Sequence, residues 1–146
     1  MKIGIIDYGS GNLHSAHNAV RQAASVACPG GVIERITSAP DLKSCDRIIL
    51  PGVGHFADCY VGLSAIEDMI DTLNELVRVQ ARPFLGICVG MQLLADIGNE
   101  GGTSVPGLGW IPGDVVHLGE KMDKQSLSDL KIPHMGWNHI QLHQSN

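Results

Sequence analysis

The chain alternates short apolar runs with segments of helical periodicity, and this alternation constrains its fold more than any other feature. The apolar runs cover residues 3–6, 31–36, 47–50 and 83–87, and each is followed within a few residues by a glycine, a proline or a helix-capping serine. Strands that alternate with helices form parallel sheets with helices on both faces. We therefore expect an α/β fold with a mostly parallel, doubly wound sheet and a working site beyond the carboxyl ends of its strands.

Four helices are expected between and after these strands. Apolar residues at helical spacing predict a helix from residue 13, with Asn12 as its cap. Ser38 and Pro40 are typical of a helix start. Residues 65–80 place apolar side chains on one face and charged ones largely on the other, which predicts an amphipathic helix. A further helix is expected from residue 89 to about 97, where Gly98 would end it.

The composition of the sequence changes after Gly98. Glycine and proline become frequent, and apolar runs at residues 115–118 and 137–142 flank a polar stretch at 119–131. This pattern predicts an antiparallel extension with a polar tip. The last run comes close to Asn146 without a closing helix or a partner strand, so we expect residues 1–146 to form a single domain that is incomplete at its C-terminal end.

Composition excludes several classes of protein. The 146 residues suffice for one domain, and hydrophobic residues make up 44% of them, but no apolar run approaches the roughly 20 residues of a spanning helix. The N-terminus lacks a secretion signal, so a cytoplasmic protein is expected. The net charge of −5 without a basic cluster argues against nucleic acid as a partner. The four cysteines form no C-x-x-C pair, which suggests reduced thiols and neither a zinc site nor a disulfide framework.

The segment Gly86-Ile87-Cys88-Val89-Gly90 has the form G-x-C-x-G at a junction between strand and helix. Its glycines suit a sharp turn that holds the cysteine in a strained backbone conformation. The turn would expose the thiol at the first turn of a helix, where the dipole and free N–H groups favour the thiolate. We therefore predict that Cys88 is a nucleophile, although most lone cysteines are small buried hydrophobes.

A second loop, Pro51-Gly52-Val53-Gly54, follows the strand at residues 47–50, whose carboxyl end should lie on the same edge as Cys88. Its backbone N–H groups could supply one donor to an oxyanion, and the N–H of Val89 could supply another. The alternative is an ordinary turn at the exit of a strand. Only the combination with the cysteine turn favours a functional role.

These motifs resemble those of the class I (triad-type) glutamine amidotransferases. The resemblance is carried by residues 86–94 and 51–54, and it spans nearly the whole chain. Two further stretches, Asp7-Tyr8-Gly9-Ser10-Gly11-Asn12-Leu13 and Pro133-His134-Met135-Gly136-Trp137-Asn138, are more narrowly similar to the glutaminase subunits of imidazole glycerol phosphate synthases, enzymes of histidine biosynthesis.

The resemblance implies a role for each matching residue. Cys88 would attack the side-chain amide of L-glutamine, form a thioester and release ammonia. The N–H groups of Val53 and Val89 would hold the oxyanion, and Gly52 and Gln92 would contact the glutamine. No cofactor or metal is implied.

The resemblance also implies a partner, a (β/α)8-barrel cyclase subunit through which the ammonia would pass. Asn12, Met135 and Trp137 would lie on the face that docks this barrel. A closed docking face has a physical reason, because free ammonia is largely protonated at neutral pH and would be lost to solvent.

The sequence departs from the family pattern at three places. Val89 stands where leucine is usual, and His55 follows the second loop where a small residue is common. The family's catalytic His and Glu, carried by an H-P-E-type motif, have no counterpart, so we expect this chain alone not to hydrolyse glutamine at a useful rate.

None of the seven histidines lies in an H-x-E pattern. His14 and His17 suit the surface of the first helix, and His134 suits the docking face. The histidines at positions 117, 139 and 143 suit outward positions of late strands. His55 is the one remaining candidate for a general base. Two alternatives stay open: a non-catalytic interaction module with the same fold, and another α/β hydrolase with a nucleophilic cysteine.

Overall fold

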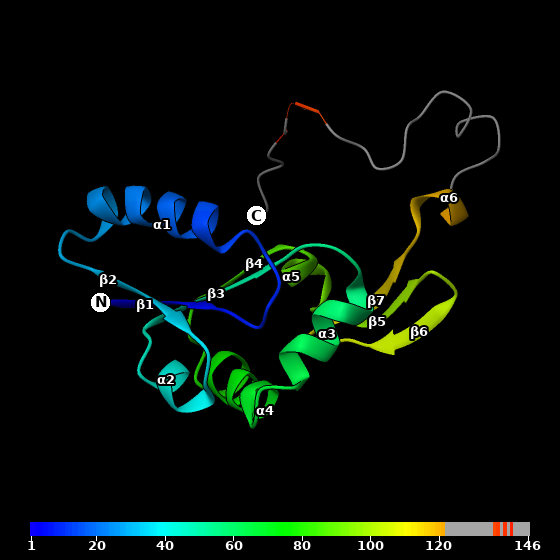
Figure 1. Cartoon of the computed structure of the whole chain (residues 1–146), viewed down its shortest axis with the longest axis horizontal. Helices are drawn as coiled ribbons and strands as arrows, with labels where there is room; N and C mark the ends of the chain where they lie inside the picture. The colour runs from blue at the N-terminus through cyan, green and yellow to red at the C-terminus, as the bar shows by residue number, and fades with distance from the viewer. Residues whose placement is uncertain (122–135, 138, 140, 142–146) are drawn as a thin grey trace. The chain divides into compact units, whose positions relative to one another are not determined.

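The computed structural model describes residues 1–121, 136, 137, 139 and 141. The chain divides into two compact units, Met1–Val115 and Val116–Asn146 (Figure 1). In chain order the elements are β1 (Lys2–Ile6), α1 (Leu13–Ala27), β2 (Val32–Ile36), α2 (Ala39–Lys43), β3 (Arg47–Gly52), α3 (Phe56–Ser64), α4 (Met69–Leu73), the π-helical turn η1 (Asn74–Val79), β4 (Phe84–Cys88), α5 (Val89–Gln92), β5 (Ala95–Glu100), β6 (Thr103–Pro106), β7 (Ile111–Val116) and α6 (Leu118–Lys121).

The main sheet of the first unit has four strands in the order β2-β1-β3-β4, and all three pairs are parallel. Helix α1 covers one face of the sheet, whereas α2, α3 and α4 lie on the other (Figure 1). Alternate residues of β3 face the two layers: Ile49 packs in the α1 core, and Ile48 and Leu50 pack in the core of the opposite face. The expected doubly wound α/β fold is confirmed.

A second sheet of three strands, in the order β6-β5-β7, follows the main sheet. β5 and β6 pair antiparallel and are joined through Gly101 and Gly102, both with positive φ. An antiparallel hairpin is present, but β5 and β6 form it, and the expectation had placed the antiparallel strands at residues 115–118 and 137–142. The helix expected over residues 89–97 is wrong, because α5 ends at Gln92. Pairing with β6 outweighs the helical pattern, because the glycine pair allows a tight hairpin and Gly98 gives the ring of Phe56 room that a side chain would fill.

The single helix expected over residues 65–80 is also wrong in its bounds. The helical segment begins only at Met69, after Asp68 adopts a left-handed conformation with φ of 57°. Aspartate is among the few non-glycine residues that tolerate this region. The predicted apolar face is nevertheless the buried one, since Met69, Leu73 and Leu76 are in the core. Helix α3, which precedes this segment, was not expected from the sequence pattern.

After residue 110 the structure agrees only in part with the elements expected from the sequence. The run expected as a strand at residues 115–118 is wrong in its bounds, because β7 ends at Val116 and α6 begins at Leu118. Most of the polar stretch and most of the run at 137–142 lie outside the described residues. The single domain over residues 1–146 stays a prediction. Across the described part of the chain, no helix has the length and apolar character needed to span a membrane.

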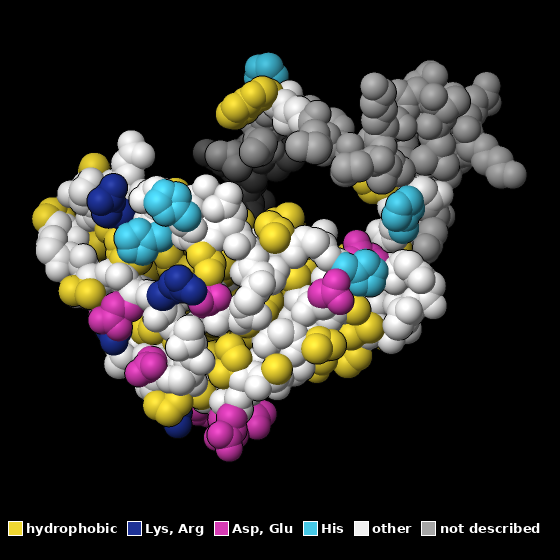
Figure 2. Space-filling model, viewed as in Figure 1, with side chains coloured by type: hydrophobic (Ala, Val, Ile, Leu, Met, Phe, Trp, Pro, Cys, Tyr) yellow, Lys and Arg dark blue, Asp and Glu magenta, His cyan; other side chains and the backbone are white. Residues whose placement is uncertain are grey.

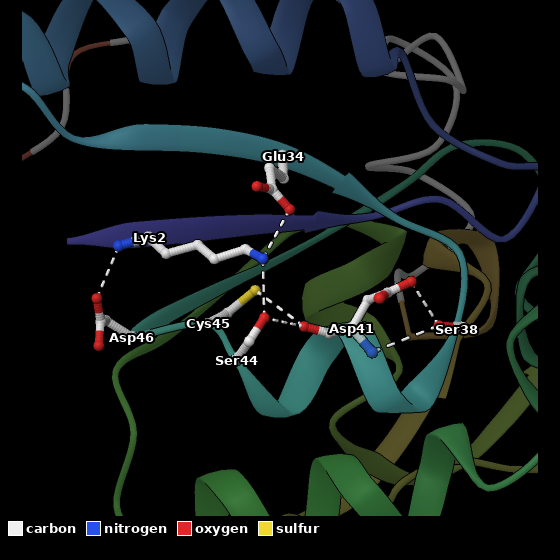
Figure 3. Close-up of polar contacts among 7 residues, drawn as sticks. All are labelled: Lys2, Glu34, Ser38, Asp41, Ser44, Cys45 and Asp46. Carbon is white, nitrogen blue, oxygen red and sulfur yellow. Dashed lines mark hydrogen bonds and ion pairs between the residues drawn. The ribbon is translucent and has the colours of Figure 1, made fainter.

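A polar network closes the end of the main sheet where its strands begin (Figure 3). The N–H of Lys2 donates to Asp46 at 2.7 Å, and its ammonium contacts Glu34 at 2.7 Å and Ser44 Oγ at 2.8 Å. The hydrogen bond and the negative charge of Glu34 stabilise the charged ammonium and raise the pKa of Lys2. The network joins β1, β2 and the end of α2 at the edge opposite the candidate site.

Candidate active site

Cys88 lies at the turn between β4 and α5. Its backbone has φ of 55° and ψ of −119°, a conformation that residues other than glycine rarely adopt, and the residue is exposed. The two flanking positions have room only for glycine. A Cβ on Gly90 would lie 1.9 Å from the carbonyl oxygen of Leu50, and one on Gly86 would lie 2.6 Å from the oxygen of Gly90. The expected sharp turn is therefore confirmed.

The loop after β3 lies directly against this turn. Gly52, the last residue of β3, is the register partner of Cys88 in the parallel ladder. A Cβ on Gly52 would meet the nitrogen of Gly90 at 2.6 Å and the side chain of Val89 at 3.0 Å. The absence of a side chain at position 52 thus lets two strand ends meet, and residues 52, 53, 88 and 89 gather at one edge of the sheet.

Tyr8 and Ser10, in the segment after β1, form hydrogen bonds to this loop. The buried hydroxyl of Tyr8 donates to the carbonyl of Pro51 at 2.7 Å. Burial, together with nearby Cys59, raises the pKa of Tyr8 well above its usual range, so the hydroxyl keeps its proton. Ser10 Oγ donates to the carbonyl of Val53 at 2.8 Å and accepts the N–H of Val53 at 3.1 Å. One of the two expected oxyanion donors therefore serves Ser10 in this structure.

The second expected donor is placed differently. Val89 is the first residue of α5, and the first N–H groups of a helix have no acceptor within the helix. Its side chain is buried, which anchors the start of α5 below the exposed thiol. Gln92, expected to contact glutamine, is half-buried at the end of the same short helix.

The expected docking residues are only partly described. Asn12 caps α1, accepting the N–H of Ser15 at 3.1 Å, and its side chain is exposed. The predicted cap is confirmed, whereas its role in docking stays a prediction. Trp137, in the second unit, is exposed, and Met135 lies outside the described residues.

His55 serves as a helix cap. Its ring nitrogen Nδ1 accepts the N–H of Ala57 at 3.3 Å at the start of α3. The adjacent N–H, that of Phe56, donates to the carboxylate of Glu100 at 2.8 Å. Sequence reasoning missed Glu100, because this contact joins residues 44 positions apart and leaves no local pattern. The structure thus fastens α3, directly after the Gly52–Val53 loop, to the hairpin that begins with β5.

His14 and His17 lie on α1 as expected, with His14 exposed and His17 half-buried. Histidine side chains are visible at the surface over this helix in Figure 2. The two residues also line a hollow with Ile5, Leu13 and Arg35, whose guanidinium is paired with Asp7. Neither histidine belongs to the group of residues around Cys88.

A parallel sheet that holds an exposed cysteine in a strained turn beside a glycine loop is the arrangement expected of an α/β protein with a nucleophilic cysteine. Comparison with known families agrees: the model described as "Glutamine amidotransferase class-I" matches residues 4–146. The chain belongs to the class I glutamine amidotransferase family.

The relatives are more specific. The chain is 53% identical over 140 residues to "Imidazole glycerol phosphate synthase subunit HisH" of Rhodopseudomonas palustris, 51% over 145 residues to the protein of that name from Rhodospirillum rubrum, and 48% over 146 residues to that of Brucella suis. These alignments cover 94%, 96% and 100% of this chain. The chain spans 61%, 63% and 65% of the length of the three relatives.

Proposed function

We propose that this chain acts in the glutaminase subunit of an imidazole glycerol phosphate synthase, releasing ammonia from L-glutamine for histidine biosynthesis. The observation that carries the proposal is the backbone of Cys88, whose positive φ presents an exposed thiol at the end of a parallel strand. A buried structural cysteine needs no such strain, whereas a nucleophile needs to project from the sheet. The relatives' name and the family match support the choice of substrate.

In the proposed reaction the sulfur of Cys88 forms a bond to the amide carbon of glutamine. The amide oxygen then carries the negative charge, which the N–H groups of Val89 and Val53 would hold. When the tetrahedral species collapses, the C–N bond breaks, and the proton that the Cys88 thiol gave up passes to the leaving nitrogen, which departs as ammonia. Water then hydrolyses the thioester to glutamate. Gly52 and Gln92 would contact the glutamine, since both lie next to the cysteine turn.

The ammonia would pass to a (β/α)8-barrel cyclase subunit in a cytoplasmic heterodimer, and the assembled synthase would act as a lyase. Asn12, Met135 and Trp137 would contribute to the docking face. The exposed side chains of Asn12 and Trp137 are compatible with this role.

The proposal is tested by labelling the 146-residue protein with a glutamine-derived chloromethyl ketone and locating the adduct by peptide mass spectrometry. We expect Cys88 to react, L-glutamine to protect it, and Cys88→Ser to abolish the adduct. Half-buried Cys28 serves as the internal control, because it should not respond to glutamine. Labelling of Cys88 that glutamine does not slow would contradict the proposed substrate.

A second candidate is a non-catalytic module that retains the fold and the docking face. Binding to a cyclase barrel by a protein whose Cys88 ignores the chloromethyl ketone would support this candidate over the first.

A further inference from the structure

A hollow lies beside the first turns of α1, over the end of the main sheet where its strands finish. Its volume is about 240 Å³, and it is lined by Ile5, Leu13, His14, His17 and Arg35. Ile5 and Arg35 are register partners near the carboxyl ends of β1 and β2. Open parallel sheets bind their ligands beyond the carboxyl ends of the strands, so the hollow has the position of a ligand site.

The guanidinium of Arg35 is held in place by a carboxylate. Its Nε donates to Oδ2 of Asp7 at 2.7 Å, and its Nη2 contacts the same oxygen. Among the residues that the structure describes, Nη1 has no hydrogen-bond acceptor, and the side chain of Arg35 is 67% exposed. Asp7 therefore fixes the orientation of the guanidinium and leaves donors of Nη1 available to a ligand.

The start of α1 adds further donors. The amide nitrogen of Asn18, which can only donate, lies 2.9 Å from Nε2 of His14, so Nδ1 carries the proton of the neutral ring. The N–H of Ser15 donates to the side chain of Asn12, whereas within the described part of the chain the N–H of His14 has no acceptor. The positive end of the helix dipole also lies here.

The charge around the hollow differs from that of the whole chain. The chain has 15 acidic and 10 basic residues, but α1 contains neither Asp nor Glu and carries His14, His17 and Arg21. Figure 2 shows histidine side chains together with Lys or Arg side chains over this helix. The negative charge of Asp7 is balanced by its pair with Arg35. The hollow therefore favours an anion over a cation.

We propose that this hollow binds a small phosphate monoester. The side chains of His14, His17 and Arg35 offer donors around one opening, which suits a tetrahedral group with three free oxygens better than a planar carboxylate with two. The apolar side chains of Ile5 and Leu13 would contact the carbon part of the ester. A water molecule takes up about 30 Å³ in the liquid, so the hollow has room for the phosphate and a short carbon chain.

The test is a calorimetric titration of the 146-residue protein with glycerol 3-phosphate. We expect saturable binding of one molecule at millimolar concentration or below, weaker binding of inorganic phosphate, which lacks the carbon part, and no binding of glycerol. Amide chemical shifts in NMR spectra should change at residues 13–17 and at Arg35. Absence of saturable binding, or shift changes that leave these residues out, would overturn the site.

Two variants and one control separate the hollow from general charge attraction. Arg35→Gln should weaken binding of glycerol 3-phosphate roughly tenfold, and His17→Leu, which leaves the pair of Arg35 and Asp7 intact, roughly fivefold. Arg21→Gln removes the same charge from an exposed position of α1 outside the hollow and should change the affinity less than about twofold. Equal weakening by Arg21→Gln and Arg35→Gln, or full affinity in His17→Leu, would overturn the proposal.

Urea unfolding of each variant shows that the compared proteins are folded. The site does not involve Cys88, so failure of this proposal leaves the proposed function untouched. Failure of the glutamine-protection experiment likewise leaves the phosphate site standing.

Discussion

Gly52 and Cys88 are register partners at the carboxyl ends of β3 and β4. The ladder that joins the two strands therefore also sets the distance between the candidate nucleophile and the candidate oxyanion loop. Gly90, at the cysteine turn, packs on the carbonyl of Leu50 in β3. A change at the turn therefore also displaces the loop that follows β3.

Gly90→Ala should strongly destabilise the protein. The new Cβ would lie 1.9 Å from the oxygen of Leu50, a backbone atom that cannot move without disturbing β3. We expect a loss of at least about 3 kcal/mol in the free energy of unfolding, measured by urea denaturation. Gly30→Ala is the control, since Gly30 has φ of 83° and nothing within 4 Å of the added atom, so it reports backbone strain alone, about 1–2 kcal/mol. Equal losses in both variants would contradict the packing argument.

Tyr8→Phe should cost about 1–2 kcal/mol, because it leaves the carbonyl of Pro51 without its buried donor. The pH dependence gives a second measurement. Folding raises the pKa of Tyr8 above its usual 10, so the stabilisation is complete below about pH 10 and is lost as the pH rises beyond that value, where the unfolded chain ionises first.

We expect the stability of the parent protein to fall more steeply above pH 10 than that of Tyr8→Phe. Tyr60→Phe is the matched control for the general effect of removing a tyrosine hydroxyl. Parallel pH profiles for the parent and Tyr8→Phe would mean that the Tyr8 hydroxyl is not buried as described.

Glu100→Ala should lower stability by about 1 kcal/mol, because its carboxylate accepts the N–H of Phe56 at the positive end of α3. Added salt should reduce part of this difference. Exposed Glu67 offers a control substitution, Glu67→Ala, with an expected change within about 0.5 kcal/mol. Thermal unfolding at two salt concentrations checks both variants. A Glu100→Ala protein as stable as Glu67→Ala would contradict the capping role of Glu100.

Much of the fold could be predicted from local pattern. The strands β1 to β4 follow apolar runs bounded by turn residues, and Asn12 and Ser38 cap helices as expected. The cysteine turn could also be predicted, because two glycines around one cysteine leave few other backbone geometries. The helices after β3 and β4 were harder. Asp68 interrupts one amphipathic pattern through a backbone conformation that aspartate tolerates but does not require.

The sequence by itself determined the parallel α/β order and the strained turn at Cys88, because both depend on residues close together in the chain. Only the tertiary structure decided that β5 is a strand, that Glu100 caps α3, and that the N–H of Val53 binds Ser10. The physical reason is that the bonds of Ser10 and Glu100 join residues 43 and 44 positions apart, and that Gly98 of β5 packs against the distant ring of Phe56. Such bonds depend on strand register and on the packing of helices on the sheet, which no short segment encodes.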